Sequence, residues 1–459
     1  MLEKNQIYQV KIIDDGYQGE GIAKIDNFPI FIQGAIKGEE VKIKILKVQS
    51  SFAYGKIIEI IKQVKNRVES ECKVYNKCGG CNLRHIDYEY TLKIKKAIVQ
   101  NCLYKALNKN IEVKDVIGMK KPMFYRNKLQ YPIGLNKDKQ AVMGVYSNRT
   151  HNIVPVSKCY IQNEICNEIA NDIFEFINKN NISVYDEVTL KGTVRHIVIR
   201  IGVKTNEILV TIVVNDNNLK KDKELVEYIT KKYPNIKTIV KNYNTKNTNV
   251  ILGDRNEIIY GSGYIYDILG EYKFKISPLS FYQVNPIQTE ILYNTAIKSI
   301  EKKSLADKQI DIALDLYCGI GTIGIFASKY FKKVYGIEKV KQAIDDAKEN
   351  AKINNVENIE FHVGDVEEIL PQILKNINKT PNVVFVDPPR KGLDNKTIDV
   401  LKKIQPEKII YISCNPATLA RDLKELEEKY LIKEIQPVDM FPYTSHVECV
   451  ALLELKDCR

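Results

Sequence analysis

The 459-residue sequence has no uninterrupted apolar run that approaches membrane-spanning length. Its first residues, Met1 to Lys4, already carry charge, and no apolar segment of the kind found in signal peptides follows them. Internal repeats and low-complexity segments are also lacking. We therefore expect a globular, soluble, cytoplasmic protein that does not associate with membranes.

A disulfide framework is not expected either. Ten cysteines in a cytoplasmic chain favour free thiols, or ligands of a metal ion or cluster, over disulfides. The length of the chain predicts two to four domains, with enough apolar residues to give each a core.

The formal net charge of +12 is concentrated in one part of the chain. Residues 1–60 carry eight basic and eight acidic side chains, whereas residues 61–160 carry twenty basic and seven acidic ones. A local excess of this size is typical of a phosphate-binding surface, which favours nucleic acid as the partner. The alternative interpretation is that these charges form an ordinary solvated face.

Residues 1–60 contain five short runs of alternating apolar residues, separated by glycine-containing turns. This pattern is typical of a small OB-like β-barrel. The stretches Gly19-x-Gly21-Ile-Ala and Gly34-Ala-x-x-Gly38-Glu resemble the TRAM domain, a barrel that occurs fused to RNA-modifying enzymes. The resemblance implies RNA binding, whereas the neutral charge of the barrel leaves open a role as a spacer or a protein-docking module.

Residues 61–268 are expected to form a central α+β domain, which begins with a cysteine motif. Cys72, Cys78 and Cys81 lie close together, two glycines separate the last pair, and Cys159 is a candidate fourth ligand. The glycine turn lets two sulphur atoms face one centre. Spacing alone leaves a four-cysteine zinc site and an iron–sulphur cluster equally possible. Four protein thiolates would close the site, which indicates a structural role.

The rest of this central region combines helical and strand patterns. Residues 86–107 have the apolar periodicity of a helix with several lysines, and the helical part, at about residues 90–120, could pack on the domain that follows. Residues 125–131 and 195–200 are predicted to be strands that present basic and aromatic side chains. Such side chains would suit phosphates and unstacked bases, although ordinary sheet faces are the alternative.

Residues 269–459 alternate between strands and helices, which predicts an α/β fold with a doubly wound, Rossmann-like sheet. An apolar strand ends near Asp315, and Tyr317 and a glycine loop lead into a helix. Glu338 ends the next strand, 23 residues after Asp315, where an acid can accept both hydroxyls of a ribose. The loop lacks the three-glycine pyrophosphate signature, so S-adenosylmethionine is favoured over a dinucleotide.

Three reactive side chains are predicted at strand ends of this sheet. Asp387 precedes a double proline, Cys414 follows the β-branched run 408–413, and Glu448 opens the last apolar strand. The carboxyl ends of parallel strands form the edge at which ligands collect, so the thiol is a candidate nucleophile. The alternatives are that Cys414 is a buried small hydrophobe and that Glu448 is a solubility charge on an edge strand.

The order of these motifs resembles the RNA uracil-5 methyltransferases, specifically the 23S ribosomal RNA branch, over essentially the whole chain. The resemblance implies S-adenosylmethionine as the methyl donor and a [4Fe–4S] cluster in the central domain. The implied cluster ligands are Cys72, Cys78, Cys81 and Cys159, and the implied cofactor-binding residues are Gln283, Tyr317, Glu338 and Asp387.

The chemistry of such an enzyme explains why these residue types are needed. Uracil C5 is a weak nucleophile, so the Cys414 thiolate is expected to add to C6 and make C5 electron-rich. Glu448 is expected to remove the C5 proton afterwards, and Asp387 to contact either the cofactor or the base edge. Because the target carbons are inaccessible in stacked RNA, the base has to be flipped out.

Two rival functions are left open. An amino-methyltransferase acting on adenine or cytosine shares the Asp-Pro-Pro loop, but it would want an aromatic residue where Arg390 stands and has no use for Cys414. A non-catalytic RNA-binding protein would explain the barrel and the basic region only. The sequence does not identify the target uridine, a transfer RNA target is not ruled out, and we expect a monomer without an obligate protein partner.

Overall fold

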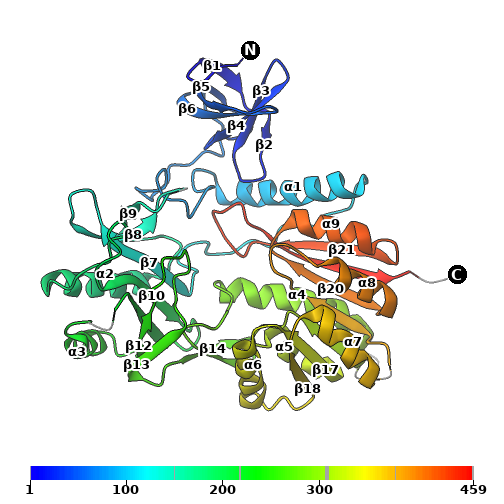
Figure 1. The fold of residues 1–459 in the computed structure, drawn as a ribbon. Coiled ribbons are helices and arrows are strands. Elements are labelled where there is room, and N and C mark those ends of the chain that lie inside the picture. The colour runs from blue at the N-terminus through cyan, green and yellow to red at the C-terminus, as the bar shows by residue number, and fades with distance from the viewer. Residues whose placement is uncertain (1, 149, 217–218, 305–309, 378, 457–459) are drawn as a thin grey trace.

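The computed structural model describes residues 2–148, 150–216, 219–304, 310–377 and 379–456. Three large sheets follow one another along the described chain, an N-terminal, a central and a C-terminal sheet, with a two-stranded sheet between the last two (Figure 1). Helix α1 lies between the N-terminal and C-terminal sheets. Within the described residues, no helix combines the length and the hydropathy needed to cross a bilayer.

The N-terminal sheet forms a barrel, as the alternating pattern predicts. Its strand order is β1-β5-β6-β4-β3-β2. The two outermost strands, β1 and β2, are consecutive in the chain, and between them the Ile13 N–H donates to the Ile22 carbonyl of β3, 2.8 Å away. The two ends of the sheet are thereby joined. Isoleucines at alternate positions fill the interior. The strands are β1 Ile7–Lys11, β2 Asp14–Asp15, β3 Gly21–Ile25, β4 Phe28–Gln33, β5 Glu40–Val48 and β6 Ala53–Lys62.

The central sheet has seven strands in the order β13-β12-β11-β10-β7-β8-β9. Helices α2 (Glu164–Lys179) and α3 (Asp222–Lys232) bury their apolar faces in the same cluster as this sheet. The strands are β7 Lys128–Leu135, β8 Ala141–Tyr146, β9 Ile153–Pro155, β10 Val194–Ile201, β11 Ile208–Val214, β12 Ile236–Tyr243 and β13 Arg255–Gly261. A hairpin of β14 (Ile265–Leu269) and β15 (Tyr272–Ile276) leads to the C-terminal sheet.

The prediction that the strand around residues 195–200 presents its basic side chains is wrong. Arg195 and Arg200 are only 6% and 4% exposed, because all residues of β10 are buried and both faces of the strand are therefore covered. Arg195 donates to the carbonyl of Lys246 (2.9 Å), and Arg200 donates to the carbonyl of Ser280. Both guanidinium groups therefore hold neighbouring loops and are not available to RNA.

The C-terminal sheet has the order β18-β17-β16-β19-β20-β22-β21, which confirms the predicted Rossmann-like fold. β16 to β20 are parallel, and β22 runs antiparallel between β20 and β21. The strands are β16 Ile310–Leu316, β17 Phe331–Glu338, β18 Ile359–Val363, β19 Val383–Val386, β20 Lys408–Ser413, β21 Tyr430–Val438 and β22 Glu448–Leu455.

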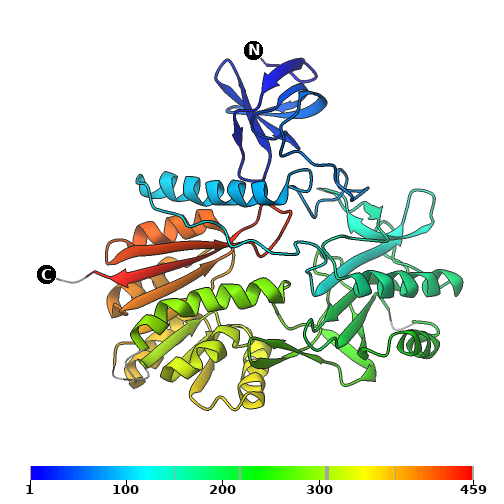
Figure 2. The same ribbon diagram turned by 180° about the vertical axis from the view of Figure 1, so that it is seen from behind.

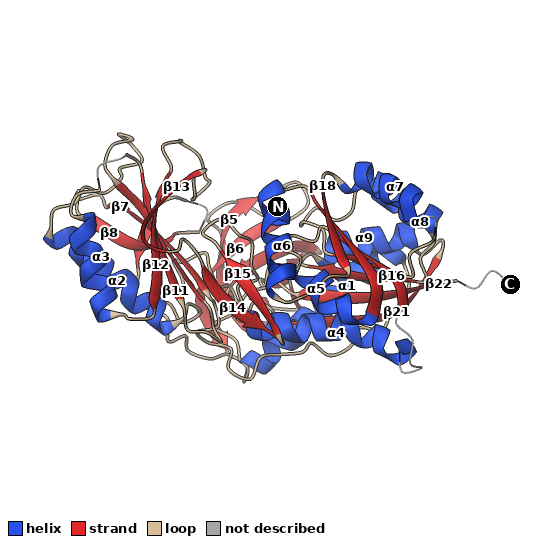
Figure 3. Ribbon diagram, turned by 90° about the horizontal axis from the view of Figure 1, so that it is seen from below, coloured by secondary structure: helices blue, strands red, loops and turns tan. Residues whose placement is uncertain are grey.

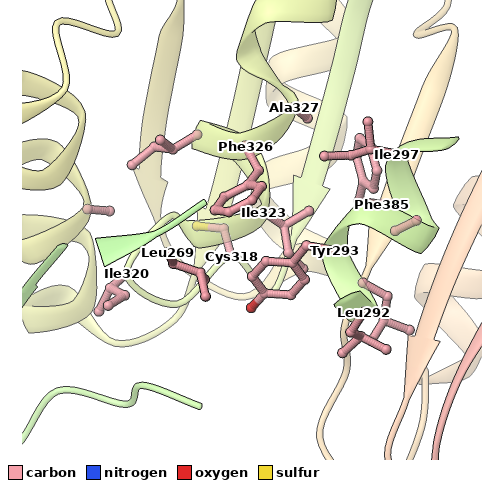
Figure 4. Close-up of a cluster of buried hydrophobic side chains, with 14 of the residues drawn as sticks. Leu269, Leu292, Tyr293, Ile297, Cys318, Ile320, Ile323, Phe326, Ala327 and Phe385 are labelled. Atoms are coloured by element: carbon pink, nitrogen blue, oxygen red, sulfur yellow. The ribbon is translucent and has the colours of Figure 1, made fainter. Parts of the chain in front are cut away.

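Helices cover both faces of this sheet (Figure 3). One buried cluster joins α4, α5 and α6 to the sheet, and Cys318 packs inside it, beside Tyr293 and Phe326 (Figure 4). The other cluster joins α7, α8 and α9 to the opposite face, with residues of α1. The helices are α4 Pro286–Ser304, α5 Thr322–Ala327, α6 Lys341–Ile353, α7 Val366–Ile377, α8 Asn395–Ile404 and α9 Pro416–Leu426.

Helix α1 (Tyr88–Leu107) packs on the C-terminal sheet although it precedes the central sheet in sequence. Val99 and Leu103 lie in the same buried cluster as Leu419 and Leu423 of α9. Seen from behind, α1 and α9 lie on one side of β20 to β22, and α4 lies on the other (Figure 2). Helix α1, which belongs to the basic segment 61–160, thus lies across the Rossmann-like domain on the side of the barrel, whereas β7 to β9 of the same segment belong to the central sheet (Figure 1).

Candidate active site

Strand pairing brings the three strand-end groups to one edge of the C-terminal sheet. Ser413 of β20 pairs with Cys449 of the antiparallel β22, so Cys414 and Glu448 come next along the same ladder. Asp387 follows β19, whose Val386 pairs with Tyr411 of β20. One thiol and two carboxyl groups therefore meet where the parallel strands end, as the sequence predicts.

The two carboxyl groups are held in an environment that disfavours their charge. Glu448 is 4% exposed, and burial, reinforced by the nearby Asp387, raises its pKa to about 8, while Arg390 acts in the opposite direction. Burial raises the pKa of Asp387 to about 7. Near neutral pH both carboxyl groups are therefore protonated in a large fraction of the molecules. Glu448 also lies on an internal strand, so the reading of it as an edge-strand solubility charge is wrong.

The same surroundings keep the Cys414 thiol protonated in the free protein. Burial raises the pKa of Cys414 to about 11, with further contributions from Glu448 and Asp387, whereas Arg390 lowers it. The side chain is only half-buried, and together with Arg390 and His446 it lines a cavity of about 490 Å³. A thiol so placed can be reached from solvent and has potential proton acceptors beside it.

Asn415 fixes the backbone next to Cys414. Its side-chain oxygen caps α9 by accepting from the Ala417 N–H (3.1 Å), and its Nδ2 donates to the Arg390 carbonyl (3.0 Å). The same side-chain oxygen accepts a 3.0 Å hydrogen bond from the hydroxyl of Tyr17 in the barrel. The loop that carries the thiol is therefore tied both to the Asp387 loop and to the N-terminal barrel.

The loop before Glu448 is anchored by a buried ion pair. Lys95 of α1 and Asp439 are both fully buried and form an ion pair, and Lys95 also donates to the Phe441 carbonyl (3.0 Å). The Tyr88 hydroxyl donates to the second oxygen of Asp439 (2.8 Å). Asp439 thus serves to dock α1 and does not face the strand-end groups. Lys95, one of the lysines predicted on this helix, is correspondingly unavailable to solvent.

Asn82 connects three segments close to the same site. Its Nδ2 donates to the Gln18 carbonyl of the barrel (2.6 Å) and to the Ser445 hydroxyl (3.0 Å), and its oxygen accepts from the Ser445 N–H (2.8 Å). Since Asn82 directly follows Cys81, the cysteine loop, the barrel and the loop before Glu448 form one hydrogen-bonded unit.

A second group of residues forms a cradle at the ends of β16 and β17. Both oxygens of Glu338 accept backbone N–H groups, from Gly319 (3.2 Å) and Val340 (2.9 Å). Tyr317 adopts a positive φ of 66°, and its hydroxyl lies 3.5 Å from both Asp394 and Thr397. This places a tyrosine, an acid and a glycine loop together, which is the arrangement predicted for a nucleoside-binding crevice.

Asp315 lies beside this cradle, whereas Gln283 makes no hydrogen bond with Tyr317 or Glu338 among the described residues. Asp315 is fully buried, accepts from the Gly324 N–H (2.8 Å), and has a pKa raised to about 8 by burial, with smaller contributions from Asp387 and Glu338. Those contributions link the cradle electrostatically to the strand-end site. Gln283 lies just before α4, where its carbonyl accepts from Asn127 Nδ2 (3.0 Å).

Some neighbours of the site were not predicted. Tyr293 of α4 is buried, and its pKa is raised by burial and by Asp387, Asp315 and Glu448, which places its hydroxyl near all three carboxyl groups. Tyr17 is separated from Asn415 by 398 residues, and nothing in its local sequence signals the contact. Asn415 could have been identified, because an asparagine before a proline at a helix start is a capping signal.

The four cysteines implied as ligands share one cavity. Cys72, Cys78, Cys81 and Cys159 all line a space of about 280 Å³ in the central region. The turn between two of them is fixed by the Gly80 N–H, which lies 3.2 Å from Cys78 Sγ. Among the described residues, however, no set of three or more His, Cys, Asp or Glu side chains is arranged to hold a metal ion.

The other walls of this cysteine cavity favour a negatively charged group. Nε and Nη1 of Arg84, and Nε of Arg126, are buried without a hydrogen-bond partner, and both arginines line the cavity. Unpaired buried guanidinium groups are costly unless an anion balances them. Four cysteines around a shared space are a donor set of the kind that a zinc ion or an iron–sulphur cluster uses.

Comparisons with known proteins agree with this geometry. A model of the tRNA (uracil-5-)-methyltransferase family matches residues 87–456, and a TRAM domain model matches residues 2–58. An uncharacterized RNA methyltransferase of Clostridium tetani is 45% identical over 98% of this chain and 97% of its own, and one of Clostridium acetobutylicum is 46% identical over 99% and 98%.

A solved structure extends the similarity to nearly the whole fold. It is the Pyrococcus abyssi tRNA (uracil-54, C5)-methyltransferase in complex with S-adenosyl-L-homocysteine, with 29% identity and a TM-score of 0.76. The match covers 97% of this chain and 100% of that protein. With an N-terminal TRAM domain and a Rossmann-like domain that both match, the chain belongs to the tRNA (uracil-5-)-methyltransferase family.

Proposed function

We propose that the protein transfers a methyl group from S-adenosylmethionine to C5 of a uridine in 23S ribosomal RNA, in the cytoplasm. The observation that carries this proposal is the meeting of Cys414, Glu448 and Asp387 at one sheet edge, beside the cradle of Tyr317 and Glu338. The division of the chain into barrel, central domain and catalytic domain, at about residues 60 and 268, belongs to the same proposal.

Cys414 would act as the nucleophile. Its thiolate adds to C6 of the flipped uracil, and the electron pair of the C5–C6 bond moves to give an enolate that makes C5 nucleophilic. A carboxyl group with a pKa of about 7 to 8 is a far better proton acceptor for the thiol than an ordinary carboxylate, and Asp387 and Glu448 are both of this kind. S-adenosylmethionine would supply an electrophilic methyl group: as C5 bonds to it, the methyl–sulphur bond breaks and S-adenosylhomocysteine leaves with the electron pair.

Glu448 would complete the reaction as the base. After methylation C5 still carries its proton, and removal of that proton by Glu448 restores the C5–C6 double bond and expels the Cys414 thiolate from C6. The raised pKa of Glu448 suits this step, because a general base works best when its pKa lies near the working pH. Gln283, Tyr317, Glu338 and Asp387 would hold the cofactor.

A covalent trapping experiment tests the mechanism. RNA that contains 5-fluorouridine should form a methylated adduct with the wild-type protein that survives denaturation, because no C5 proton is available for the last step. Cys414→Ser should form none, whereas Cys318→Ser, at a buried cysteine in the core beside the cradle, should still form it. An adduct on the Cys414→Ser protein would contradict the nucleophile role, and a methyl group on nitrogen or ribose would contradict the whole scheme.

A tRNA target is the second candidate. The Pyrococcus abyssi protein acts on tRNA, and its structure matches 97% of this chain. Labelled methyl transfer into purified 23S rRNA and into total tRNA, both from a strain that lacks this protein, separates the two. Label in rRNA alone supports the proposal, and label in tRNA alone moves the assignment to the second candidate.

The [4Fe–4S] cluster is also part of the proposal, with Cys72, Cys78, Cys81 and Cys159 as ligands. The shared cavity, and the buried nitrogens of Arg84 and Arg126 that have no hydrogen-bond partner, support it. Protein purified without oxygen should absorb in the visible range through thiolate-to-iron charge transfer, and Cys78→Ala should lose that absorption. Cys166→Ala, at a buried cysteine outside the cavity, is the control. Colourless wild-type protein containing zinc would overturn the cluster assignment.

A further inference from the structure

The barrel carries three aromatic side chains on its outer surface, Phe31, Phe52 and Tyr54. The ring centroids of Phe31 and Phe52 lie 5.5 Å apart, those of Phe52 and Tyr54 lie 5.3 Å apart, and both pairs are edge-to-face. All three side chains are only half-buried. We refer to these three residues as the aromatic cluster.

Strand geometry explains why the aromatic cluster faces outwards. Ile30 and Ile32 are fully buried in the barrel, so Phe31 between them points to the opposite side of β4. Phe31 is paired with Tyr54 of the parallel strand β6, and side chains at paired positions share a face. The barrel interior is complete without these rings, so stabilising the barrel core does not account for them.

The aromatic cluster opens into the cavity that contains the proposed nucleophile. Phe31 and Tyr54 line the same space of about 490 Å³ as Cys414 and Arg390. Leu46, 47% exposed, extends the apolar side of this space. Pockets of roughly 300–1,000 Å³ typically enclose a ligand, so there is room for more than the edge of one base.

The net charge of the barrel indicates whether the aromatic cluster would bind the phosphates or the bases of an RNA. Residues 1–60 are electrically neutral overall, whereas residues 61–160 hold the basic excess of the chain. A neutral surface gains little from phosphates, whose binding depends on counterion release by lysine and arginine. Aromatic rings, in contrast, bind any unpaired base through its π-face, and with little dependence on salt.

We propose that the aromatic cluster is a stacking site for an unpaired base of the RNA substrate, adjacent to the uridine that Cys414 attacks. This proposal rests on the proposed function, and it assigns different parts of the RNA to the central region and to the barrel. The central region binds the phosphates, and the barrel holds a neighbouring base and thereby keeps the target strand unstacked over the thiol.

Binding of a short single-stranded RNA that contains uridine tests the proposal. Phe31→Ala and Tyr54→Ala together should weaken binding roughly tenfold to a hundredfold, because one stacked base is lost. The slope of log Kd against log salt should not change, since no phosphate contact is removed. The matched control is Tyr104→Ala on α1, at an exposed tyrosine (54%) that does not line the cavity.

The absence of tryptophan from the chain allows a direct readout. Phe31→Trp introduces a single indole, whose fluorescence should be quenched when a base stacks on it and should recover in part when the RNA is made abasic. Tyr104→Trp should respond little. Phe31→Leu, which keeps an apolar side chain at this surface position but removes the ring, should weaken binding like Phe31→Ala if stacking is the cause.

The outcomes separate this inference from the proposed function. Unchanged affinity of the double alanine variant, a lowered salt slope, or an unquenched indole would each overturn the stacking site, even if methyl transfer to uridine is observed. Conversely, if stacking is observed but no methyl group enters uridine C5, the aromatic cluster stands as an RNA site and the proposed function fails.

Discussion

At the scale of single residues, the two carboxyl groups beside Cys414 distinguish this site from an ordinary nucleotide-binding crevice. Asp387 raises the pKa of Glu448, both carboxyl groups raise the pKa of the Cys414 thiol, and Arg390 lowers the pKa of Glu448 and of Cys414. A site of this kind can pass a proton between sulphur and oxygen with little change in net charge.

We expect Glu448→Gln to stop the reaction after methyl transfer, because an amide does not take up the C5 proton. Release of methylated natural RNA should slow by at least about a hundredfold, the usual scale for loss of a general base. A methylated covalent complex should accumulate and be visible by denaturing gel electrophoresis. Glu454→Gln, on the same strand, is the control. Normal turnover of the Glu448 variant would remove this residue from the base role.

The Tyr17 hydroxyl is expected to position the thiol loop from a distance. Tyr17→Phe removes its hydrogen bond to Asn415 and should lower kcat by roughly two- to tenfold, the value of one hydrogen bond, with little change in RNA affinity. Tyr8→Phe, whose hydroxyl contacts Gln6 within the barrel, serves as the control. A loss of RNA affinity without a fall in kcat would show that Tyr17 contacts substrate and does not act through Asn415.

These residues differ in how far the sequence reveals them. Cys414, Asp387 and Glu448 stand at strand ends, and the local pattern of β-branched residues followed by proline or a loop is enough to predict their common edge. The partnership of Tyr17 and Asn415 depends on how the barrel docks, which no local pattern encodes. The protonation of Glu448 depends on burial and on Asp387, and both follow from packing.

At the scale of secondary-structure elements, α1 is held by charge as well as by apolar contact. Its apolar residues pack on α9, and Lys95 reaches the buried Asp439. The periodicity of residues 86–107 predicts the helix but does not distinguish Lys95 from the other lysines. The reason is physical: Lys95 is buried because it pairs with a buried carboxylate, and Asp439 lies 344 residues away in the sequence.

Lys95→Met is expected to destabilise the protein by about 3–5 kcal/mol, because it leaves the Asp439 charge buried without a partner. Urea unfolding would measure this loss. Lys95→Met combined with Asp439→Asn should recover much of it, since neither charge is left. Lys96→Met removes the neighbouring ion pair with Asp115, which is 96% exposed, and should cost at most about 1 kcal/mol. Equal effects of the two single variants would contradict a special role for Lys95.

In strand β10, the sequence pattern predicted exposed basic side chains that the structure shows to be buried. Every residue of β10 is buried, and both Arg195 and Arg200 bond to backbone carbonyls. The loops that supply these carbonyls come from distant parts of the sequence, so no local pattern reveals that these charges are internal.

At the scale of the whole molecule, the buried carboxyl groups link stability to pH. Asp315 and Glu448 have pKa values raised to about 8, well above those of an unfolded chain, so the folded protein binds more protons between about pH 4 and pH 8. These two groups should therefore lower the free energy of unfolding as pH rises through this range, whereas His85 and His196, with pKa values lowered to about 3, and Lys128, with a pKa lowered to about 7, act in the opposite direction. Each fully titrating group contributes up to about 1.4 kcal/mol per pH unit.

We expect the melting temperature of the ligand-free protein to be higher near pH 6 than near pH 8.5. Glu448→Gln should reduce this difference, because the neutral amide does not titrate, whereas Glu454→Gln, with the side chain 37% exposed, should not. Differential scanning calorimetry at several pH values would measure it. A melting temperature that rises towards pH 8.5 would contradict the assigned protonation of these groups.

The order of the three parts was readable from the sequence, but their arrangement was not. Alternation, cysteine spacing and glycine loops are local patterns that indicate each part separately. The docking of the barrel over the Cys414 loop relies on polar contacts between distant segments, such as Asn82 with Gln18 and Ser445. Such contacts leave no periodic trace in the sequence.

The position of β22 has a consequence for synthesis of the protein. This strand is translated last in its sheet, yet it is inserted between β20 and β21, and Glu448 is its first residue. A nascent chain in which this strand had not yet formed would leave β20 and β21 unpaired with each other and would lack Glu448, the proposed base. The proposed site can therefore be assembled only after the last strand of the sheet has been translated and inserted.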